Sequence, residues 1–490
     1  MKGTSNVNRT NVSSVLLLLL TLLLASGVLF TSCGHIHVYE DTVILPTCTS
    51  VGYTIHTCAC GDVYYSDYKA KTAHEYAEWT TAREADAIYG GEETSVCVHC
   101  GKLLIRETSN VSGLTRVLIT RGSRDESMTL EYIGASHRFS CLVSLSQATA
   151  ETDKPDLYLT LTDENDAAYS IDLGWGPRNV YHLSAYTVDP TKLREQECIH
   201  FWELLRKQSD ANPAIYLYDG AIPIQLYEDG VYRGLYFLAP PAGYGADEGG
   251  KRSVLVQHGT AAGCMFKEEP VRYDGTNSGF SFLNITDERA EQAWASFQEF
   301  HAFVRTAEDA DFTRHLKNYA DVDELIDFYL FSQVFFAAGA GEENILWLTE
   351  DGVHWKADFR TLECSIGKNS EGSTVYNGLR LPVRKPEGLS AVSNHYLWTR
   401  ILACFPKTVV ERYRALRELI TLESALSYFR SMYDAIPSEL YSADAELYPS
   451  VPYPPDTEAV EQFLTVRFTE LDDRILSEPE PDEPQESQEN

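Results

Sequence analysis

Histidine and cysteine residues near the start of the chain have the types and spacing of a metal site. Four of those between residues 34 and 61 form a candidate ligand set: His35, Cys48, Cys58 and Cys60. Thiolate sulfur and imidazole nitrogen are ligands that Zn²⁺ prefers, and three cysteines with one histidine complete a tetrahedral structural site. The spacing leaves two interpretations open, a zinc site or a small module with disulfides or free thiols. The Cys58-x-Cys60 step is tighter than the usual Cys-x₂-Cys, which favours the second interpretation.

A similar pattern returns 39 residues later, where Cys97 follows Cys58. The second unit offers three ligands: His74, Cys97 and Cys100. It lacks a fourth, since Ala87 stands at the position of Cys48. Two such units over residues 34–110 resemble the short His/Cys repeats of bacterial surface proteins. The resemblance implies a spacer or presentation module without chemistry of its own.

The N-terminus has the pattern of a bacterial lipoprotein signal. Lys2 and Arg9 precede an almost purely apolar run over residues 15–30, shorter than the roughly 18 residues of a spanning helix. Small residues then lead to Cys33, so residues 1–33 predict a signal segment, with lipidation at Cys33. An uncleaved anchor is the alternative. Both place the rest of the chain outside the cytoplasm, at the outer face of the bacterial cell membrane.

The length, composition and net charge of the chain limit the kinds of partner that it can bind. At 490 residues the chain has room for one large domain and a smaller one, and 44% hydrophobic residues are typical of a folded protein. The formal net charge of −32 argues against nucleic acid, whose phosphates require a basic surface. We expect an unknown secreted or cell-surface protein as the partner. Five further cysteines are predicted as buried thiols rather than disulfides: Cys141, Cys198, Cys264, Cys364 and Cys404.

From about residue 114, short runs of alternating apolar residues predict half-buried antiparallel strands. The runs are residues 116–120, 127–133, 139–145, 154–161 and 180–183. Two more runs flank Asp229-Gly230, a dipeptide preferred in tight hairpins, over residues 222–238. A helix is predicted to open at Asp189-Pro190. Further helices are predicted near residues 293–304, 394–433 and 460–471, and the tail 477–490 should be disordered.

Residues 321–367 join a long helix, a small-residue loop and a tight hairpin. Asp321 and Glu324 have the spacing of a capping box, which predicts the start of the helix. The loop covers residues 337–344 and ends in an Asn. The hairpin turns at residues 351–352, and carboxylates follow it. A loop of this kind, with an Asn at its end, is the element that must position any catalytic group.

Four stretches resemble the CotH-type secreted kinase-like family, known from spore coat protein H. They are residues 188–194, the hairpin over 226–238, residues 322–345, and residues 394–402 with 460–467. The resemblance covers residues 111–476 and implies an α+β, atypical protein-kinase-like fold. Its N-terminal part would be an antiparallel sheet and its C-terminal part mostly helical. The family also implies binding of ATP with Mg²⁺ or Mn²⁺ and phosphorylation of secreted proteins.

The resemblance assigns candidate roles one position at a time. The family's metal-binding Asn falls on Asn344, and the surviving carboxylate of its Asp-x-Asp falls on Glu363. Glu363 and, in another register, Asp358 are therefore the catalytic candidates. Lys154 and Asn344 are the ATP-binding candidates, and Asn344 and Glu363 the metal ligands. The family's catalytic-loop Asp falls on Gly339, so this group is missing.

Each candidate also has an ordinary structural interpretation. Asn344 fits a turn cap, Glu363 a solvated or salt-bridged side chain, and Lys154 an exposed loop lysine. The missing Asp favours a degenerate kinase, a pseudokinase that acts as a binding or scaffold protein at the cell surface. One alternative is an active ATP- and metal-dependent Ser/Thr kinase of secreted or coat proteins. Another is a surface adhesion or spacer protein that works through its His/Cys repeats.

Overall fold

The structure is a computed structural model that divides into two compact units. Unit 1 comprises Met1–Glu84 and Gly91–Ser109, and unit 2 comprises Ala85–Gly90 and Asn110–Asn490. The described residues are 35–122, 127–148, 152–209, 216–243, 252–258, 266–286, 288–337, 344–368 and 396–476. Within these ranges, no helix combines the length and the apolar character that crossing a membrane requires.

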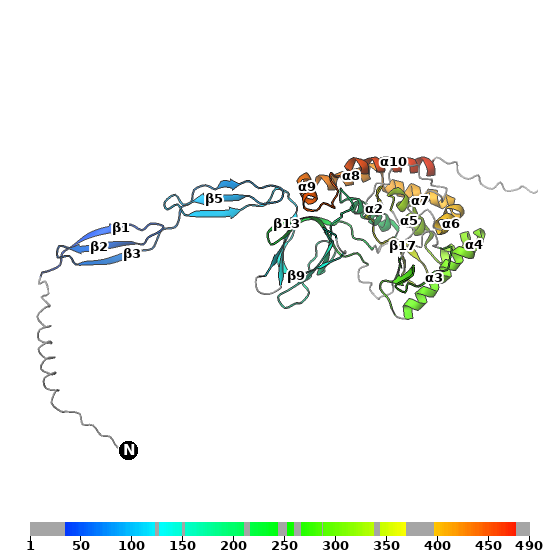
Figure 1. Ribbon diagram of the computed structural model, residues 1–490, viewed down its shortest axis with the longest axis horizontal. Coiled ribbons are helices and arrows are strands. Elements are labelled where there is room, and N and C mark those ends of the chain that lie inside the picture. Colours follow the sequence, from blue (N-terminus) through cyan, green and yellow to red (C-terminus); the bar gives the residue numbers. More distant parts are fainter. Residues whose placement is uncertain are drawn as a thin grey trace, which may run out of the picture. The chain divides into compact units, whose positions relative to one another are not determined.

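Unit 1 consists of two three-stranded antiparallel sheets, one for each repeat (Figure 1). Their strands are β1 (Tyr39–Ile44), β2 (Gly52–Cys58) and β3 (Val63–Lys69), then β4 (Thr80–Arg83), β5 (Glu92–Val96) and β6 (Leu103–Glu107). Among the described residues of unit 1, the buried hydrophobic side chains are three cysteines: Cys48, Cys58 and Cys97. Sheets of this size bury too little apolar surface to be stable alone, so unit 1 needs another source of stability.

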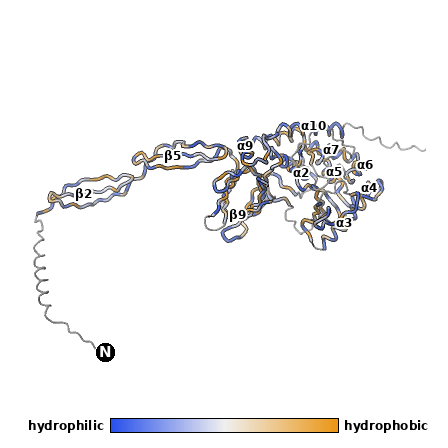
Figure 2. The backbone as a smooth tube through the Cα atoms, viewed as in Figure 1, coloured by the Kyte–Doolittle hydropathy of each residue, from blue (hydrophilic) through white to orange (hydrophobic). Residues whose placement is uncertain are grey.

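The first part of unit 2 is a closed seven-stranded barrel with the strand order β10-β11-β13-β12-β7-β8-β9. The strands are β7 (Thr115–Arg121), β8 (Met128–Ile133), β9 (Arg138–Gln147), β10 (Leu157–Thr162), β11 (Val180–Ser184), β12 (Ile222–Glu228) and β13 (Val231–Ala239). Hydrophobic and hydrophilic stretches interleave along these strands (Figure 2), and inward residues such as Val117, Leu130 and Leu159 form the barrel core. The alternation predicted in the sequence therefore reflects one buried face.

Closure of the barrel is the main difference from the predicted antiparallel sheet. Six of the pairings are antiparallel, but β12 pairs with β7 in parallel and so joins the two ends of the sheet. The hairpin between β12 and β13 turns at Asp229 and Gly230, which have positive φ angles of 50° and 79°. These angles are those of the tight hairpin turn that the Asp-Gly dipeptide predicts.

The second part of unit 2 is a four-stranded sheet surrounded by helices (Figure 1). The sheet has the order β15 (Gly279–Phe282), β14 (Ser253–His258), β16 (Ile345–Thr349) and β17 (Lys356–Phe359). The helices are α2 (Arg194–Ser209), α3 (Glu288–Thr306), α4 (Asp309–His315), η1 (Leu316–Asn318), α5 (Val322–Val334), α6 (Tyr396–Cys404), α7 (Pro406–Leu419), α8 (Leu422–Asp434), α9 (Ser438–Leu447) and α10 (Thr457–Ile475).

Helix α5 is the centre of this second part. Its side chains are buried from Glu324 to its last residue, which is typical of a helix surrounded by protein on all sides. Asp321 caps it, because the Asp321 carboxylate accepts the backbone N–H of Glu324 at 3.1 Å. The side chain of Glu324 instead pairs with Arg206 and Lys356. The predicted helix start is therefore correct.

The helix predicted after Asp189-Pro190 begins later than expected. Helix α2 starts at Arg194, and Lys192 has a φ of 60°, which no helix accommodates. Asp189 still caps the helix, since its carboxylate accepts the N–H groups of Leu193 at 2.9 Å and Arg194 at 3.0 Å. The mixture of sheets and helices confirms the predicted α+β class.

Candidate functional site

A small pocket lies in unit 2 where the barrel, α2 and the segment after β17 meet. Its volume is about 180 Å³, and carboxyl groups from three separate segments line it. Asp156 precedes β10, Glu195 is in the first turn of α2, and Glu363 follows β17. His182 of β11 also lines the pocket, with its Nε2 3.8 Å from Asp156 Oδ2. Ligand sites usually enclose about 300–1,000 Å³, so the described walls hold a smaller space than most.

Glu195 holds the segment that carries Glu363 against α2. Its Oε1 accepts two hydrogen bonds at 2.9 Å, from the Thr361 hydroxyl and from the Leu362 backbone N–H. The Thr361 hydroxyl in turn accepts the backbone N–H of Glu363 at 3.2 Å. The position where the family resemblance expects the first Asp is thus occupied by a hydroxyl that donates to α2.

The environment of Glu363 favours its neutral form. Burial, followed by the negative charges of Glu195 and Asp156, raises the pKa of Glu363 to about 8. Burial also raises the pKa of Glu195. At neutral pH, Glu363 is therefore mostly protonated. A protonated carboxyl donates a hydrogen bond but is a poor ligand for a divalent cation.

Asn344 and Asp358 lie near the same segment, but in different surroundings. Asn344 Oδ1 accepts the backbone N–H of Thr361 at 2.8 Å, so the amide joins the start of β16 to the residues after β17. Asp358 is buried, and its two oxygens accept hydrogen bonds from Trp202 Nε1 at 2.8 Å and from the Tyr216 backbone N–H at 3.1 Å. Neither residue is among those that line the pocket.

Lys154 lies in a fully buried ionic cluster rather than in an exposed loop. Its Nζ donates to the two carboxylate oxygens of Asp444 at 2.7 and 2.8 Å, and to the Leu235 carbonyl at 2.6 Å. Lys192 Nζ lies 3.0 Å from the same carboxylate. Burial and the charge of Lys192 lower the pKa of Lys154 to about 7. Lys154 thus connects the barrel to α9, and the pocket lining does not include it.

Sequence reasoning missed Asp156, Glu195 and Asp444. Glu195 follows the Arg of the helix-start motif, yet a glutamate in the first turn of a helix is usually an exposed residue that favours the helix dipole. Asp444 is 290 positions from Lys154, and no local pattern connects them. Only the folded chain reveals these partners.

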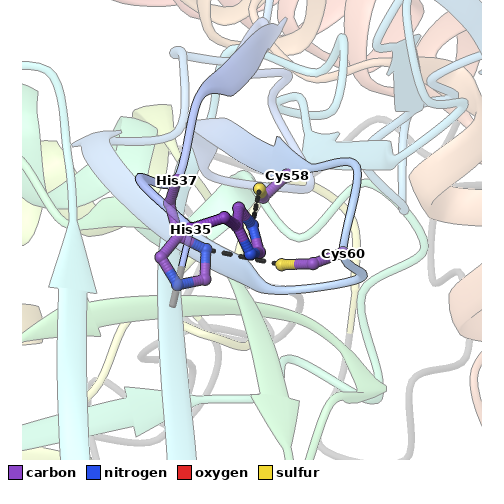
Figure 3. A group of neighbouring side chains, drawn as sticks. All are labelled: His35, His37, Cys58 and Cys60. Atoms are coloured by element: carbon purple, nitrogen blue, oxygen red, sulfur yellow. Dashed lines mark hydrogen bonds between the residues drawn. The ribbon is translucent and has the colours of Figure 1, made fainter. Parts of the chain in front are cut away.

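Unit 1 brings four metal-ligand side chains together in the first repeat (Figure 3): His35, His37, Cys58 and Cys60. Cys58 Sγ lies 3.6 Å from His35 Nε2, and Cys60 Sγ lies 3.4 Å from His37 Nδ1. All four ligand atoms lie within 4.8 Å of one another. Two thiolates and two imidazoles are a donor set that suits tetrahedral Zn²⁺. His37 thus occupies the place in which the sequence pattern predicts Cys48, and Cys48 lies in a different group.

The thiol chemistry of this cluster also suits a metal. The backbone N–H of Cys60 and the His35 imidazole lower the pKa of Cys58 to about 6. Cys58 is therefore largely a thiolate at neutral pH, which is the form that binds metal ions. We refer to His35, His37, Cys58 and Cys60 as the first cluster.

Three predicted features lie outside the described residues. They are the lipidation candidate Cys33, the loop position Gly339 and the acidic tail 477–490. The cysteines at 48, 58, 60, 97, 100, 141, 198, 364 and 404 are all free thiols, and Cys264 is outside the described ranges.

Comparison with protein-family models finds a match within unit 2. The family model described as CotH kinase protein matches residues 150–358. The match includes Lys154, Glu195 and Asp358 but ends before Glu363. No curated protein matches the chain.

Proposed function

Because residues 150–358 match the CotH family model, we propose that unit 2 is a kinase-like domain that has lost phosphoryl transfer and acts as a binding or scaffold domain. The protein would be an extracytoplasmic lipoprotein whose His/Cys repeats form a spacer. The barrel, the helical part and the pocket between them support an atypical kinase-like arrangement. Its partner is a secreted or cell-surface protein.

The replacement of the first expected metal-binding Asp by Thr361 is the observation that carries this proposal. Phosphoryl transfer needs carboxylates or amides on Mg²⁺ and a carboxylate that orients the attacking hydroxyl. Glu363 is the carboxyl group expected at the metal, and burial with its acidic neighbours raises its pKa to about 8. The neighbouring position is Thr361, whose hydroxyl donates to Glu195. The pocket therefore keeps one carboxyl group of the expected Asp-x-Asp pair, with a hydroxyl in place of the other.

The state of Lys154 supports the same conclusion. A phosphate-binding lysine must extend a charged ammonium group into the nucleotide site. The Lys154 amine has three oxygen acceptors within 2.8 Å and a pKa lowered to about 7. Moving it to a phosphate would leave Asp444 and Lys192 buried without it, at considerable cost.

The test is nucleotide binding by the full chain. We expect no rise in melting temperature with ATP and Mg²⁺ or Mn²⁺, and no transfer of labelled γ-phosphate to the chain itself or to a general acceptor such as casein. Metal-dependent stabilisation together with transfer that Glu363→Ala abolishes would show an active kinase. The matched control is Glu350→Ala, because Glu350 is half-exposed and pairs with Arg252 at the opposite end of β16.

Lipid anchoring is a separate part of the proposal, supported by the apolar run before Cys33. We expect the mature chain to begin at Cys33 with a lipid on its sulfur, detectable by mass spectrometry of the N-terminal peptide. Cys33→Ala should then abolish the modification and move the protein from the membrane fraction or leave it unprocessed. An unmodified Cys33 in membrane-bound wild-type protein would instead indicate the uncleaved anchor.

Zinc in the first cluster is also proposed, on the convergence of its four ligands. Zn²⁺ bound there would join the segment before β1 to the β2–β3 turn and so replace the missing apolar core of the first sheet. Metal analysis of the full chain should find zinc that His35→Ala removes. The exposed His99, which contacts Glu75, gives a matched control in His99→Ala. If His35→Ala and His99→Ala both keep the zinc content of the wild type, the proposal is contradicted.

A further inference from the structure

A second group of metal-ligand side chains contains residues from both repeats. Its members are Cys48, His74, Cys97 and Cys100, and we call it the junction cluster. Cys48 lies between β1 and β2 of the first repeat, whereas the other three belong to the second repeat. All four ligand atoms lie within 4.8 Å of one another. The second repeat is therefore not one ligand short, because the repeat before it supplies the missing thiol.

The distances fit a tetrahedral ion. Zn²⁺ with Zn–S bonds of about 2.3 Å and Zn–N bonds of about 2.0–2.1 Å places two sulfur ligands about 3.8 Å apart and a sulfur and a nitrogen about 3.6 Å apart. The Cys48 and Cys97 sulfurs are 4.0 Å apart, and Cys100 Sγ is 3.4 Å from His74 Nδ1. A disulfide requires about 2.0 Å between its sulfurs, and the three thiols are free.

The burial pattern gives an independent reason for a bound ion. Two of the three buried hydrophobic side chains in the described part of unit 1, Cys48 and Cys97, are members of the junction cluster. Three converging thiols and an imidazole are groups that a bound metal ion satisfies. Small domains without an apolar core commonly obtain their stability from a structural metal.

We propose that the junction cluster is a Cys₃His zinc site shared by the two repeats, which fastens each repeat to the next along the chain. Zn²⁺ is the ion this donor set favours, since three thiolates and one imidazole form a closed structural site. The site differs from the first cluster in its ligands and in joining two modules rather than closing one.

The position of Cys48 then has a general role as the link to the following module. Its equivalent in the second repeat is Ala87, after which no third repeat follows. Ala87 belongs to unit 2, where its side chain packs in the main hydrophobic core and its carbonyl accepts a hydrogen bond from Gln225 Nε2 at 2.8 Å. The neighbouring Ile88 carbonyl accepts one from the Tyr227 hydroxyl. The second repeat therefore has the methyl group of Ala87 where the first repeat has the thiol of Cys48. The module that follows is unit 2, whose described residues include no His/Cys group near Ala87.

The first repeat also departs from the pattern, because all four ligands of its cluster come from the repeat itself. Residues 1–34 contain no repeat of this kind, and the first cluster has no cysteine at a position equivalent to Cys48. His37 fills the fourth place in the first cluster, and the residue 39 positions later is Tyr76. Terminal repeats commonly differ in this way from internal ones. The ligand sets of both clusters thus follow from one rule, the fourth ligand coming from the preceding module where one exists.

Metal stoichiometry of the full chain tests the proposal. Protein purified in a reducing buffer without chelators should contain two zinc ions per chain by elemental mass spectrometry. Cys48→Ala should contain one, and the remaining ion should be the one that His35→Ala removes. Cys141→Ala, which replaces a thiol of the barrel outside both clusters, should still contain two. A zinc content that Cys48→Ala leaves unchanged would refute the proposal, whereas a single ion that Cys48→Ala removes and His35→Ala keeps would refute only zinc in the first cluster.

Cobalt substitution identifies the ligands. With Co²⁺ in both sites, the thiolate-to-cobalt absorption should correspond to five thiolates in the wild type and two in Cys48→Ala. Cys100→Ala is the second variant, because Cys100 is exposed and its loss should disturb folding least. Retention of both ions by Cys48→Ala and Cys100→Ala, or a Cys48–Cys97 disulfide in place of the ion, would overturn the assignment.

Protease sensitivity tests the link between the repeats. Lys71 lies between the two sheets and is exposed. Removal of zinc from the full chain with a chelator should increase trypsin cleavage at Lys71 several-fold, and added Zn²⁺ should reverse the increase. Cys48→Ala should be cleaved at the fast rate with or without chelator, whereas His35→Ala should keep the slow rate. Equal cleavage of these two variants would show that the junction ion does not join the repeats.

Discussion

Replacement of Glu363 by Gln should flatten the pH dependence of the stability of unit 2 between pH 4.5 and 8. Burial and the nearby carboxyl groups raise the pKa of Glu363 from 4.5 to about 8 in the folded chain. Between these two values, the folded chain holds a proton on Glu363 that the unfolded chain has released. The free energy of unfolding must therefore fall as the pH rises through this window.

The pKa difference sets the size of the effect. About 3.5 pH units, at about 1.4 kcal/mol each, correspond to about 5 kcal/mol if the whole difference is realised. Partial exposure of the side chain screens some of this, so about 3–5 kcal/mol is the expected range. Gln has the shape of the protonated carboxyl group and does not titrate. Glu363→Gln should match the wild type to within about 1 kcal/mol at pH 5 and be more stable by about 3–5 kcal/mol at pH 8.

Urea unfolding of both proteins between pH 5 and pH 8.5, followed by tryptophan fluorescence, measures this difference. Subtraction of the two curves removes the contributions of the other titrating groups. Glu350→Gln, at an exposed carboxylate, should keep the wild-type profile. Parallel curves for wild type and Glu363→Gln would refute the assignment of a neutral carboxyl group in the pocket. They would also restore Glu363 as a candidate metal ligand and weaken the pseudokinase proposal.

Three further predictions concern the buried ionic cluster. Asp444→Asn should lower the free energy of unfolding by about 3–5 kcal/mol in urea titrations, because Lys154 and Lys192 lose the carboxylate that they share. The control is Asp153→Asn, at an exposed contact with Ser450, which should lower it by less than about 1 kcal/mol. Gly234→Ala should cost about 1–3 kcal/mol by the same measurement, since Gly234 has a φ of 115° and a Cβ there would lie 2.5 Å from Asp444 Oδ1; an unchanged midpoint would contradict the packing of α9 on the barrel. The pKa of Lys154 is lowered to about 7 in the folded chain, whereas the unfolded chain keeps the proton up to a pH of about 10.5. Between these two values the unfolded chain binds one proton more, so the free energy of unfolding of the wild type should rise with pH. Lys154→Met should remove this rise in the same urea titrations.

Local patterns in the sequence were sufficient for most individual elements. The Asp229-Gly230 hairpin, the cap at Asp321 and the barrel strands were predicted because each depends on residues close together in the chain. Turn angles, capping hydrogen bonds and the alternation of buried residues are all set over a few positions. The start of α2 was wrong by four residues, since the left-handed Lys192 delays it and Pro190 carries no signal of that.

The candidate pocket was predicted only in part. Glu363 was found through the family resemblance, and the structure places it in the pocket wall. Its acidic neighbours Glu195 and Asp156, which raise its pKa, come from other segments and carry no pattern of their own. The ionic partner of Lys154 lies on α9, almost 300 positions later. Such contacts depend on how distant segments pack, which periodicity does not encode.

The two metal clusters also separate what the sequence predicts from what the folded chain decides. By itself, the sequence determined seven of the eight side chains in the two clusters, the repeat of 39 residues, and the presence of Ala87 in place of a cysteine. It could not assign each ligand to a site, because counting within one repeat groups Cys48 with its nearest neighbours in sequence. Only the tertiary structure decided that Cys48 joins the following repeat and His37 replaces it, since a tetrahedral site depends on the distances among four atoms in space.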